Sequence, residues 1–125
     1  MTAFRAIVLE HFRHPRNRGA LDGATVSVEG ANPLCGDRIR VELRVIANTI
    51  DDARFTADAC ALCIASASVL TEHVRGMPLH EAERVDASWI HESLDGEPPA
   101  GRERCATLPL DTLRRALESS RGHAS

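Results

Sequence analysis

The sequence has no lysine, no tyrosine and few other aromatic residues. All fifteen basic residues are arginine, so the chain cannot form a lysine Schiff base or bind phosphate through lysine. One tryptophan and three phenylalanines argue against a ligand site of stacked aromatic rings. The enzyme classes that depend on lysine are therefore excluded, and we expect a core of Leu, Ile, Val and Ala.

An excess of positive charge and long apolar runs are missing as well. Fifteen Arg against eighteen Asp and Glu give a net charge of −3, without the positive field that binding to a phosphate backbone requires. No apolar run approaches the roughly 20 residues that cross a bilayer, and Arg5 and Glu10 interrupt the apolar pattern at the N-terminus where a signal peptide would be continuous. We expect a cytoplasmic protein with no nucleic-acid partner and no membrane partner.

The remaining composition is that of one globular domain. The chain has 125 residues, of which 43% are hydrophobic and 26% charged, and this balance excludes disorder of the whole chain. A chain of this length suits a single compact core. We expect one domain over residues 1–125, with its core between residues 4 and 118.

The spacing of apolar residues predicts an α+β fold. Helical spacing predicts five helices, at residues 4–12, 60–76, 79–85, 87–94 and from Cys105 onward. The long second helix has one apolar face, and the last helix begins near Cys105 because Pro109 is tolerated only in a first turn. Period-two alternation predicts three strands, near residues 26–28, 39–45 and 50–57. We expect a small three-stranded antiparallel sheet packed against several helices.

Four cysteines stand at the edges of these elements: Cys35, Cys60, Cys63 and Cys105. In a chain without an export signal, metal or redox chemistry is a better use for them than disulfides. Because they lie at the ends of different elements, they can converge at one end of the fold. Helix N-termini lower the pKa of a thiol, so we expect Cys60, Cys63 and Cys105 to be thiolates. The alternative for any single one is an inert, buried small side chain.

Four motifs in order resemble one known family, the iron-sulfur cluster assembly scaffolds that include the NifU N-terminal domain, IscU and SufU. The motifs are His14-Pro15-Arg16-Asn17, Cys35-Gly36-Asp37, Cys60 with the stretch Ile64–Ser68 after it, and Cys105-Ala106-Thr107-Leu108. The resemblance extends from about Phe4 to Leu117. It implies a small antiparallel sheet flanked by helices, in agreement with the apolar spacing.

The resemblance also implies a metal site and partners. Members hold a [2Fe-2S] cluster or a zinc ion and accept sulfur from a cysteine desulfurase. The ligands that the resemblance implies here are Cys35, Asp37, Cys60 and Cys105. We expect Cys105 to be the sulfur acceptor, since Arg102 and Arg104 beside it favour the thiolate.

Cys63 competes with Asp37 for the fourth ligand position. The family usually has a small residue at this place, and Cys63 follows Cys60 at the spacing by which zinc sites take two thiolates from one turn. Four thiolates would make a closed structural site, whereas a carboxylate can be displaced when a cargo is released. We therefore favour Asp37, and Cys63 then packs as an alanine-like residue.

The chain departs from both main branches of the family. Arg104 stands where IscU-type members have His, and the third-cysteine motif is similar to that of SufU. SufU members have an extra segment between the second and third cysteines, for which the 44 residues between Cys60 and Cys105 leave no room. The segment Glu97–Gly101 keeps only the prolines of the IscU segment that an Hsp70-type chaperone binds, which argues against that partner.

Three functions remain open. The first is a scaffold, a carrier and not an enzyme, that builds a [2Fe-2S] cluster and transfers it to apo-proteins. The second is a zinc-dependent sulfurtransferase with the same ligands, so spacing does not separate the two. The third is a structural zinc domain that mediates protein contacts, with Cys63 as its fourth ligand. Outside the site, we expect His11 and His14 to be exposed, and Ser66 and Ser68 to pack or to hydrogen-bond within their own helix.

Overall fold

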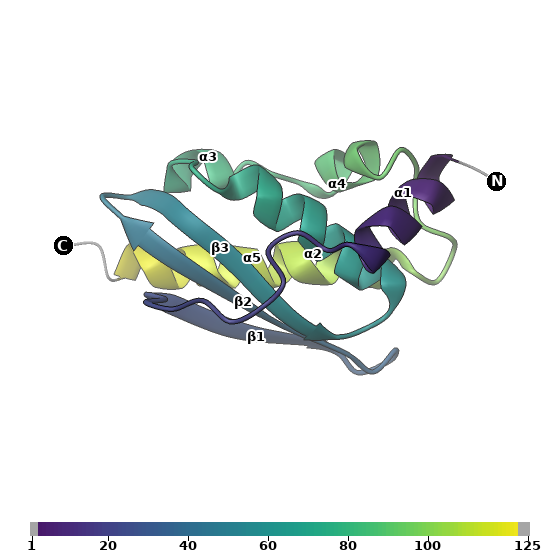
Figure 1. The fold of residues 1–125 in the computed structure, drawn as a ribbon, viewed down its shortest axis with the longest axis horizontal. Coiled ribbons are helices and arrows are strands. Elements are labelled where there is room, and N and C mark those ends of the chain that lie inside the picture. The colour runs from purple at the N-terminus through teal and green to yellow at the C-terminus, as the bar shows by residue number, and fades with distance from the viewer. Residues whose placement is uncertain (1–2, 123–125) are drawn as a thin grey trace.

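The computed structural model describes residues 3–122, which form a layer of strands and a layer of helices (Figure 1). The sheet has three antiparallel strands in the order β1-β2-β3. Their bounds are β1 (Val26–Asn32), β2 (Asp37–Ile46) and β3 (Thr49–Asp58). Val41 in the middle strand pairs with Val28 on one side and with Phe55 on the other. The predicted α+β fold with a three-stranded antiparallel sheet is confirmed.

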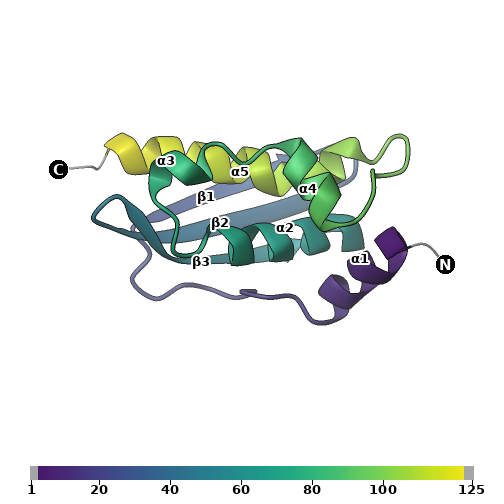
Figure 2. The ribbon, with the colours of Figure 1, turned by 90° about the horizontal axis from the view of Figure 1, so that it is seen from above.

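The helices cover one face of the sheet and leave the other face open (Figure 2). Their bounds are α1 (Ala3–Arg13), α2 (Ala61–Val74), α3 (Leu79–Ala82), α4 (Ala87–Ser93) and α5 (Glu103–Gly122). Of these, α2 and α5 pack directly on the strands, and α1 lies on α2. Within residues 3–122, no helix is long and apolar enough to cross a membrane.

The central helix α2 is buried more completely than its sequence predicts. Every residue from Leu62 to Thr71 is buried, where apolar spacing indicates a single apolar face. The reason is that β3, α1, α4 and α5 all contact this helix. A helix with neighbours on all sides has no solvent face, so small residues such as Ala65 and Ser66 are needed for close packing.

Helix α5 begins close to Cys105, as predicted, but the reason given for this start is wrong. The helix starts at Glu103, so Pro109 is its seventh residue and lies beyond the first turn. Proline has no N–H group, so the carbonyl of Cys105, four residues earlier, loses its helical donor. Pro109 is nevertheless accommodated as a buried residue within the helix.

The segment between α1 and β1 covers the outer edge of β3. The amide of Phe55 donates to the Asn17 carbonyl (3.0 Å), and the amide of Gly19 donates to the Phe55 carbonyl (2.7 Å). Arg18 and Phe55 thereby form an isolated parallel bridge. Because an open strand edge invites pairing with another chain, this cover protects the sheet from edge-to-edge association.

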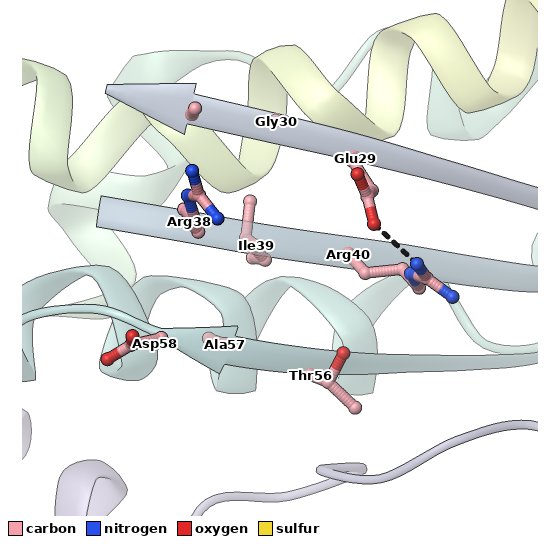
Figure 3. A pocket seen from close by; sticks show the side chains of 9 residues that line it. Glu29, Gly30, Arg38, Ile39, Arg40, Thr56, Ala57 and Asp58 are labelled. Atoms are coloured by element: carbon pink, nitrogen blue, oxygen red, sulfur yellow. Dashed lines mark hydrogen bonds and ion pairs between the residues drawn. The ribbon is translucent and has the colours of Figure 1, made fainter. Parts of the chain in front are cut away.

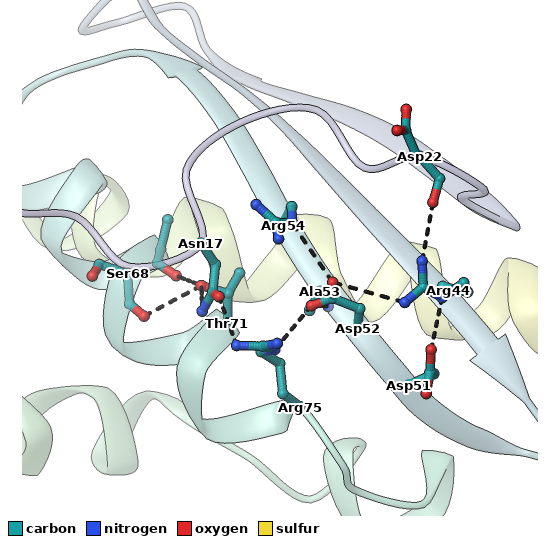
Figure 4. Close-up of polar contacts among 11 residues, drawn as sticks. Asn17, Asp22, Arg44, Asp51, Asp52, Ala53, Arg54, Ser68, Thr71 and Arg75 are labelled. Carbon is teal, nitrogen blue, oxygen red and sulfur yellow. Dashed lines mark hydrogen bonds and ion pairs between the residues drawn. The ribbon is translucent and has the colours of Figure 1, made fainter.

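A buried carboxylate fixes this segment to the sheet and to α2 (Figure 4). Asp52 in β3 has a side chain that is 9% exposed, and it lies 2.8 Å from Arg75 Nε, 3.6 Å from Arg54 Nε and 4.0 Å from an Arg44 nitrogen. Arg75 also donates to the Asn17 side-chain oxygen (3.0 Å). A buried charge is tolerated only when it is paired, and three guanidinium groups meet that need here.

Gly30 in β1 makes room for the close approach of α5. A Cβ atom at this position would lie 2.0 Å from Thr112 Oγ1 and 3.2 Å from Thr112 Cβ. We expect Gly30→Ala to destabilise the fold by about 1–3 kcal/mol, the usual range for overpacking. Urea unfolding measures this loss. In a Thr112→Ala background the same substitution should be less damaging, and an equal loss in both backgrounds would contradict steric overlap as its cause.

Two serines of α2, Ser66 and Ser68, are packed in the interior, as one of the two expected alternatives has it, but their side-chain hydrogen bonds reach other elements and do not stay within the helix. The Ser66 hydroxyl donates to the Ala106 carbonyl of α5. Ser68 Oγ accepts from the Arg16 amide (2.8 Å) and lies 2.7 Å from His11 Nδ1 in α1. His11 is therefore half-buried against α2, whereas His14 is exposed as expected. Ser68 ties both α1 and the segment after it to the central helix.

The stability of the fold is expected to fall on mild acidification. Burial, assisted by the Arg16 charge, lowers the pKa of His11, against weaker opposing effects of Glu10 and Glu72. The folded state then binds a proton less readily than the unfolded state, whose His pKa is about 6.5, so stability is complete above that pH and is lost as pH falls through it. Thermal unfolding at pH 7.5 and 5.5 measures the loss. His11→Asn should reduce it, and an unchanged pH dependence in that variant would contradict this role of His11.

Candidate metal centre

Three segments place the predicted ligands at one end of the fold. Cys35 lies in the turn between β1 and β2, and Asp37 is the first residue of β2. Cys60 is the N-cap residue of α2, and Cys105 is the third residue of α5. The turn is closed by a hydrogen bond from the Cys35 amide to the carbonyl of Asn32 (3.2 Å). Elements from separate parts of the chain therefore end at one place, as the sequence predicts.

The turn that presents Cys35 depends on a glycine. Gly36 has a φ of +73°, in the left-handed region that residues with a Cβ avoid. This conformation lets the chain reverse between the Cys35 thiol and the first residue of β2. The two side chains of the Cys35-Gly36-Asp37 motif thus reach the same site from opposite sides of the turn.

Three of the four predicted ligands form one group, and Cys60 lies beside that group without being a member of it. The ligand atoms of Cys35, Asp37 and Cys105 are all within 4.8 Å of one another. Cys105 Sγ is 3.8 Å from Cys35 Sγ, and Cys60 Sγ is 3.9 Å from Asp37 Oδ2. Two thiolates on one tetrahedral zinc, with bonds of about 2.3 Å, lie about 3.8 Å apart. The donor set and its spacing therefore fit a thiolate-binding metal ion.

The four predicted ligands differ in their exposure to solvent. Cys35 is exposed and Cys60 is half-buried, whereas Asp37 is 2% exposed and Cys105 is fully buried. The Asp37 carboxylate also accepts a hydrogen bond from the Cys60 amide at 2.9 Å. This carboxylate therefore caps the start of α2 while its second oxygen faces the thiols. The site opens to solvent on the side of Cys35.

The pKa of Cys105 shifts in the direction opposite to the one that its helix start predicts. Burial raises the pKa of Cys105 well above that of an ordinary thiol, and the neighbouring Asp37, Cys35 and Cys60 raise it further. The expectation that Cys105 is poised as a thiolate by its helix start is therefore wrong for the metal-free protein. A bound cation would reverse this effect, because a thiol that coordinates a metal ion loses its proton.

An arginine from the loop before α5 lies beside the thiols. The nearby Cys60 and Cys105 thiols raise the pKa of Arg102, in this order of effect, because their ionised forms attract its positive charge. The sequence indicates this neighbour, since Arg102 stands three residues before Cys105. It supplies positive charge to a site whose protein ligands are all anionic when a metal is bound.

Cys63 lies outside the group of ligand atoms, as Cys60 does, but Cys60 Sγ is 3.9 Å from Asp37 Oδ2. Cys63 is fully buried and belongs to the hydrophobic core. Its pKa is raised by burial first and then by the charges of Asp37, Cys60 and Cys105, so it lies close behind the site without joining the group. Cys63 is packed in the core, as an alanine-like residue at this position would be.

Sequence reasoning missed an apolar side chain next to the site. Leu34, which precedes Cys35, is 82% exposed and is the most exposed large hydrophobic residue among those described. The signal was present, because Leu34 stands between Pro33 and Cys35 in a turn that has no neighbouring element to pack against. Leu34 therefore adds an apolar side chain to the solvent-facing side of the site, next to the exposed Cys35.

The open face of the sheet begins beside the site (Figure 3). A shallow hollow of about 580 Å³ lies on it, between the ion pair of Arg40 with Glu29 and the side chains of Arg38 and Asp58. Arg38 directly follows Asp37 in β2. The hollow contains charges of both signs and none of the thiols, so it is separate from the candidate metal centre.

The fold and the site together define a class: a small α+β domain that presents three cysteines and an aspartate at one end. The model of the NifU-like N terminal domain matches residues 3–124. The chain belongs to this family.

Named relatives agree with this assignment. The chain is 40% identical over 112 residues to the bifunctional protein NifU/MnmA of Rubrobacter xylanophilus, a match that covers 89% of this chain but only 23% of that protein. It is 36% identical over 110 residues to the iron-sulfur cluster assembly scaffold protein IscU 1 of Archaeoglobus fulgidus, covering 88% of this chain and 71% of the relative.

A second type of relative has a different activity in its name. The chain is 29% identical to the zinc-dependent sulfurtransferase SufU of Bacillus subtilis over 138 aligned positions, which cover 97% of this chain and 93% of the relative. The crystal structure of the N-terminal part of a NifU-like protein from Brucella abortus has a TM-score of 0.76 and covers 94% of both chains. Its sequence identity is 21%, so this likeness concerns the fold alone.

Proposed function

We propose that the protein is a scaffold on which a [2Fe-2S] cluster is assembled and from which the cluster passes to apo-proteins. The observation that carries the proposal is the convergence of three thiols and one carboxylate at a solvent-facing end of the fold. The family membership and the scaffold relatives support it. In this proposal the protein is a carrier and the cluster is its cargo.

The ligands that we propose for the cargo are Cys35, Asp37, Cys60 and Cys105. Thiolates are the usual ligands of iron in such clusters, and four protein ligands complete the coordination of two bridged irons. The carboxylate is the one hard ligand among softer sulfurs, so it is the ligand that an incoming thiolate of a recipient displaces most easily. The exposed side of the site, at Cys35, is where the cargo would leave.

The proposed partners follow from the chemistry of the cargo. A cysteine desulfurase would supply sulfur as a persulfide, and apo forms of iron-sulfur proteins would receive the cluster. Both kinds of partner would approach from the exposed side of the site, at Cys35. We also propose a cytoplasmic location, because all four cysteines are free thiols and reducing compartments maintain that state.

Zinc-dependent sulfur transfer is the second candidate function. The 3.8 Å separation of the Cys35 and Cys105 sulfurs favours it, since this spacing suits a single tetrahedral zinc. One relative is named for this activity. A purely structural zinc domain is less well supported, because its predicted fourth ligand, Cys63, lies outside the group of ligand atoms that Cys35, Asp37 and Cys105 form.

Anaerobic reconstitution separates these functions. Metal-stripped protein is mixed with ferrous iron, cysteine and a catalytic amount of a cysteine desulfurase, and visible absorption is followed before and after addition of an apo-ferredoxin. A [2Fe-2S] spectrum that then moves to the ferredoxin is the expected result. If no chromophore forms but zinc-loaded protein accepts persulfide sulfur, the protein is a sulfurtransferase. Zinc without sulfur uptake would contradict both candidates and leave the structural domain.

A further inference from the structure

Two thiols of the candidate metal centre touch each other but differ in exposure. Cys35 lies in an exposed turn next to the exposed Leu34, whereas Cys105 has no exposed surface. The sulfur that a desulfurase delivers is bound to a cysteine of that other protein, and it moves only when its atoms touch the accepting thiol. In the described structure, Cys35 can be touched in this way and Cys105 cannot.

The contact between the two sulfurs is already formed. The Cys105 thiol donates to Cys35 Sγ at 3.8 Å. A sulfur atom added to Cys35 would extend about 2.05 Å beyond Sγ, the length of an S–S bond, and could therefore reach the Cys105 sulfur by rotation about the Cys35 side chain. Arg102, which lies near Cys60 and Cys105, supplies positive charge where negative charge develops during the transfer.

We propose that sulfur reaches the site by a relay, first to Cys35 and then to Cys105. This inference rests on the proposed function, since a desulfurase must supply the persulfide. In the first step the Cys35 sulfur attacks the terminal sulfur of the desulfurase persulfide, which leaves the desulfurase as a thiol and Cys35 as a persulfide.

In the second step the Cys105 sulfur attacks the terminal sulfur of the Cys35 persulfide. The bond between this sulfur and Cys35 breaks as its bond to Cys105 forms, and the proton of the Cys105 thiol passes to the Cys35 sulfur along the existing contact. One persulfide and one thiol are present before and after the step, so no oxidant or reductant is consumed. The relay reconciles the buried position of Cys105 with its predicted role as sulfur acceptor.

Burial protects the sulfur once it has reached Cys105. A persulfide on exposed Cys35 is open to attack by any thiol in solution, whereas one on Cys105 is shielded by the fold. Transfer also returns Cys35 to the thiol form, ready for a second sulfur. A [2Fe-2S] cluster contains two sulfide ions. Because Cys35 becomes a free thiol again after each transfer, it can accept both sulfur atoms in turn.

Peptide mapping tests the relay directly, because trypsin cleaves after arginine and separates the two thiols. Cys35 falls in the peptide 19–38 and Cys105 in the peptide 105–114. Metal-free full-length protein is mixed with a desulfurase and cysteine, quenched by alkylation over a time course and mapped by mass spectrometry. In the wild type, the added sulfur should appear on 19–38 first and accumulate on 105–114.

Variants give the relay a sharper test. Cys35→Ser should load Cys105 about tenfold or more slowly than the wild type, and Cys105→Ala should accumulate persulfide on Cys35. Cys63→Ala, which removes a core thiol close behind the site, should behave as the wild type. Circular dichroism verifies that each variant is folded.

Direct loading of Cys105 at the wild-type rate in Cys35→Ser would overturn the relay and leave the scaffold proposal intact. The same holds if the wild type is labelled on Cys105 before Cys35. Absence of persulfide from all peptides of the wild type would instead contradict the proposed function, on which the relay depends.

Discussion

Cys105→Ala is expected to form no [2Fe-2S] chromophore on reconstitution, whereas Cys63→Ala should form as much as the wild type. The two cysteines are a matched pair, because both are fully buried and both lie near the start of a helix. They differ in one respect: the Cys105 sulfur belongs to the group of ligand atoms with Cys35 and Asp37, and the Cys63 sulfur does not. Without Cys105 the cluster has two thiolate ligands in place of three, and water is a poor substitute for a thiolate on iron.

Visible absorption and iron content after anaerobic desalting measure this difference. Both variants need a check of thermal stability, since removal of a buried thiol group leaves a small cavity and costs about 1 kcal/mol. A chromophore of wild-type intensity in Cys105→Ala would contradict the ligand set. Loss of the chromophore in a folded Cys63→Ala protein would show that Cys63 is a ligand of the cluster.

Asp37→Ala is expected to hold its cluster longer and to slow transfer to an apo-ferredoxin about 10- to 100-fold, the range seen when the surroundings of a metal are altered. Asp37 is the oxygen ligand in the proposed set and lies near Cys63. Its removal opens space toward the buried thiol, so Cys63 can complete a site of four thiolates. Such a site lacks the ligand that a recipient displaces.

The double variant Asp37→Ala with Cys63→Ala tests this explanation, because it has no fourth thiol to recruit. It should lose the cluster rapidly, and equal retention in the single and double variants would contradict recruitment of Cys63. Asp37→Asn is a second control, since its side-chain oxygen can still accept the hydrogen bond from the Cys60 amide. Asp37→Ala should be less stable than Asp37→Asn by about 1–2 kcal/mol, because only the alanine variant leaves that amide unpaired.

Local patterns predicted most of the fold. Period-two alternation located the strands because only one face of the sheet is covered, so residues such as Ile39 and Val41 alternate with exposed arginines. Helical spacing and turn residues located the helices, including the end of α2 before Gly76. The convergence of the cysteines was also predictable, because ends of elements in a small two-layer fold have few places to meet.

Features that depend on packing were not predictable. The pKa of Cys105 rises because the sheet and helices exclude water from it, and the sequence around it shows only the helix start and two arginines, which act in the opposite direction. Ser68 reaches α1 because of how two helices lie on each other, and Asp52 is buried by guanidinium groups from three places in the chain. Such contacts join residues far apart in sequence, and no local pattern records them.

X-ray absorption at the zinc edge of the zinc-loaded protein tests the central claim most directly, because it counts sulfur and oxygen neighbours of the metal in solution. The account predicts three sulfur ligands at about 2.3 Å and one oxygen ligand at about 2.0 Å, supplied by Cys35, Cys60, Cys105 and Asp37. Four sulfur ligands in the wild type, reduced to three in Cys63→Ala, would contradict it and would assign the fourth position to Cys63.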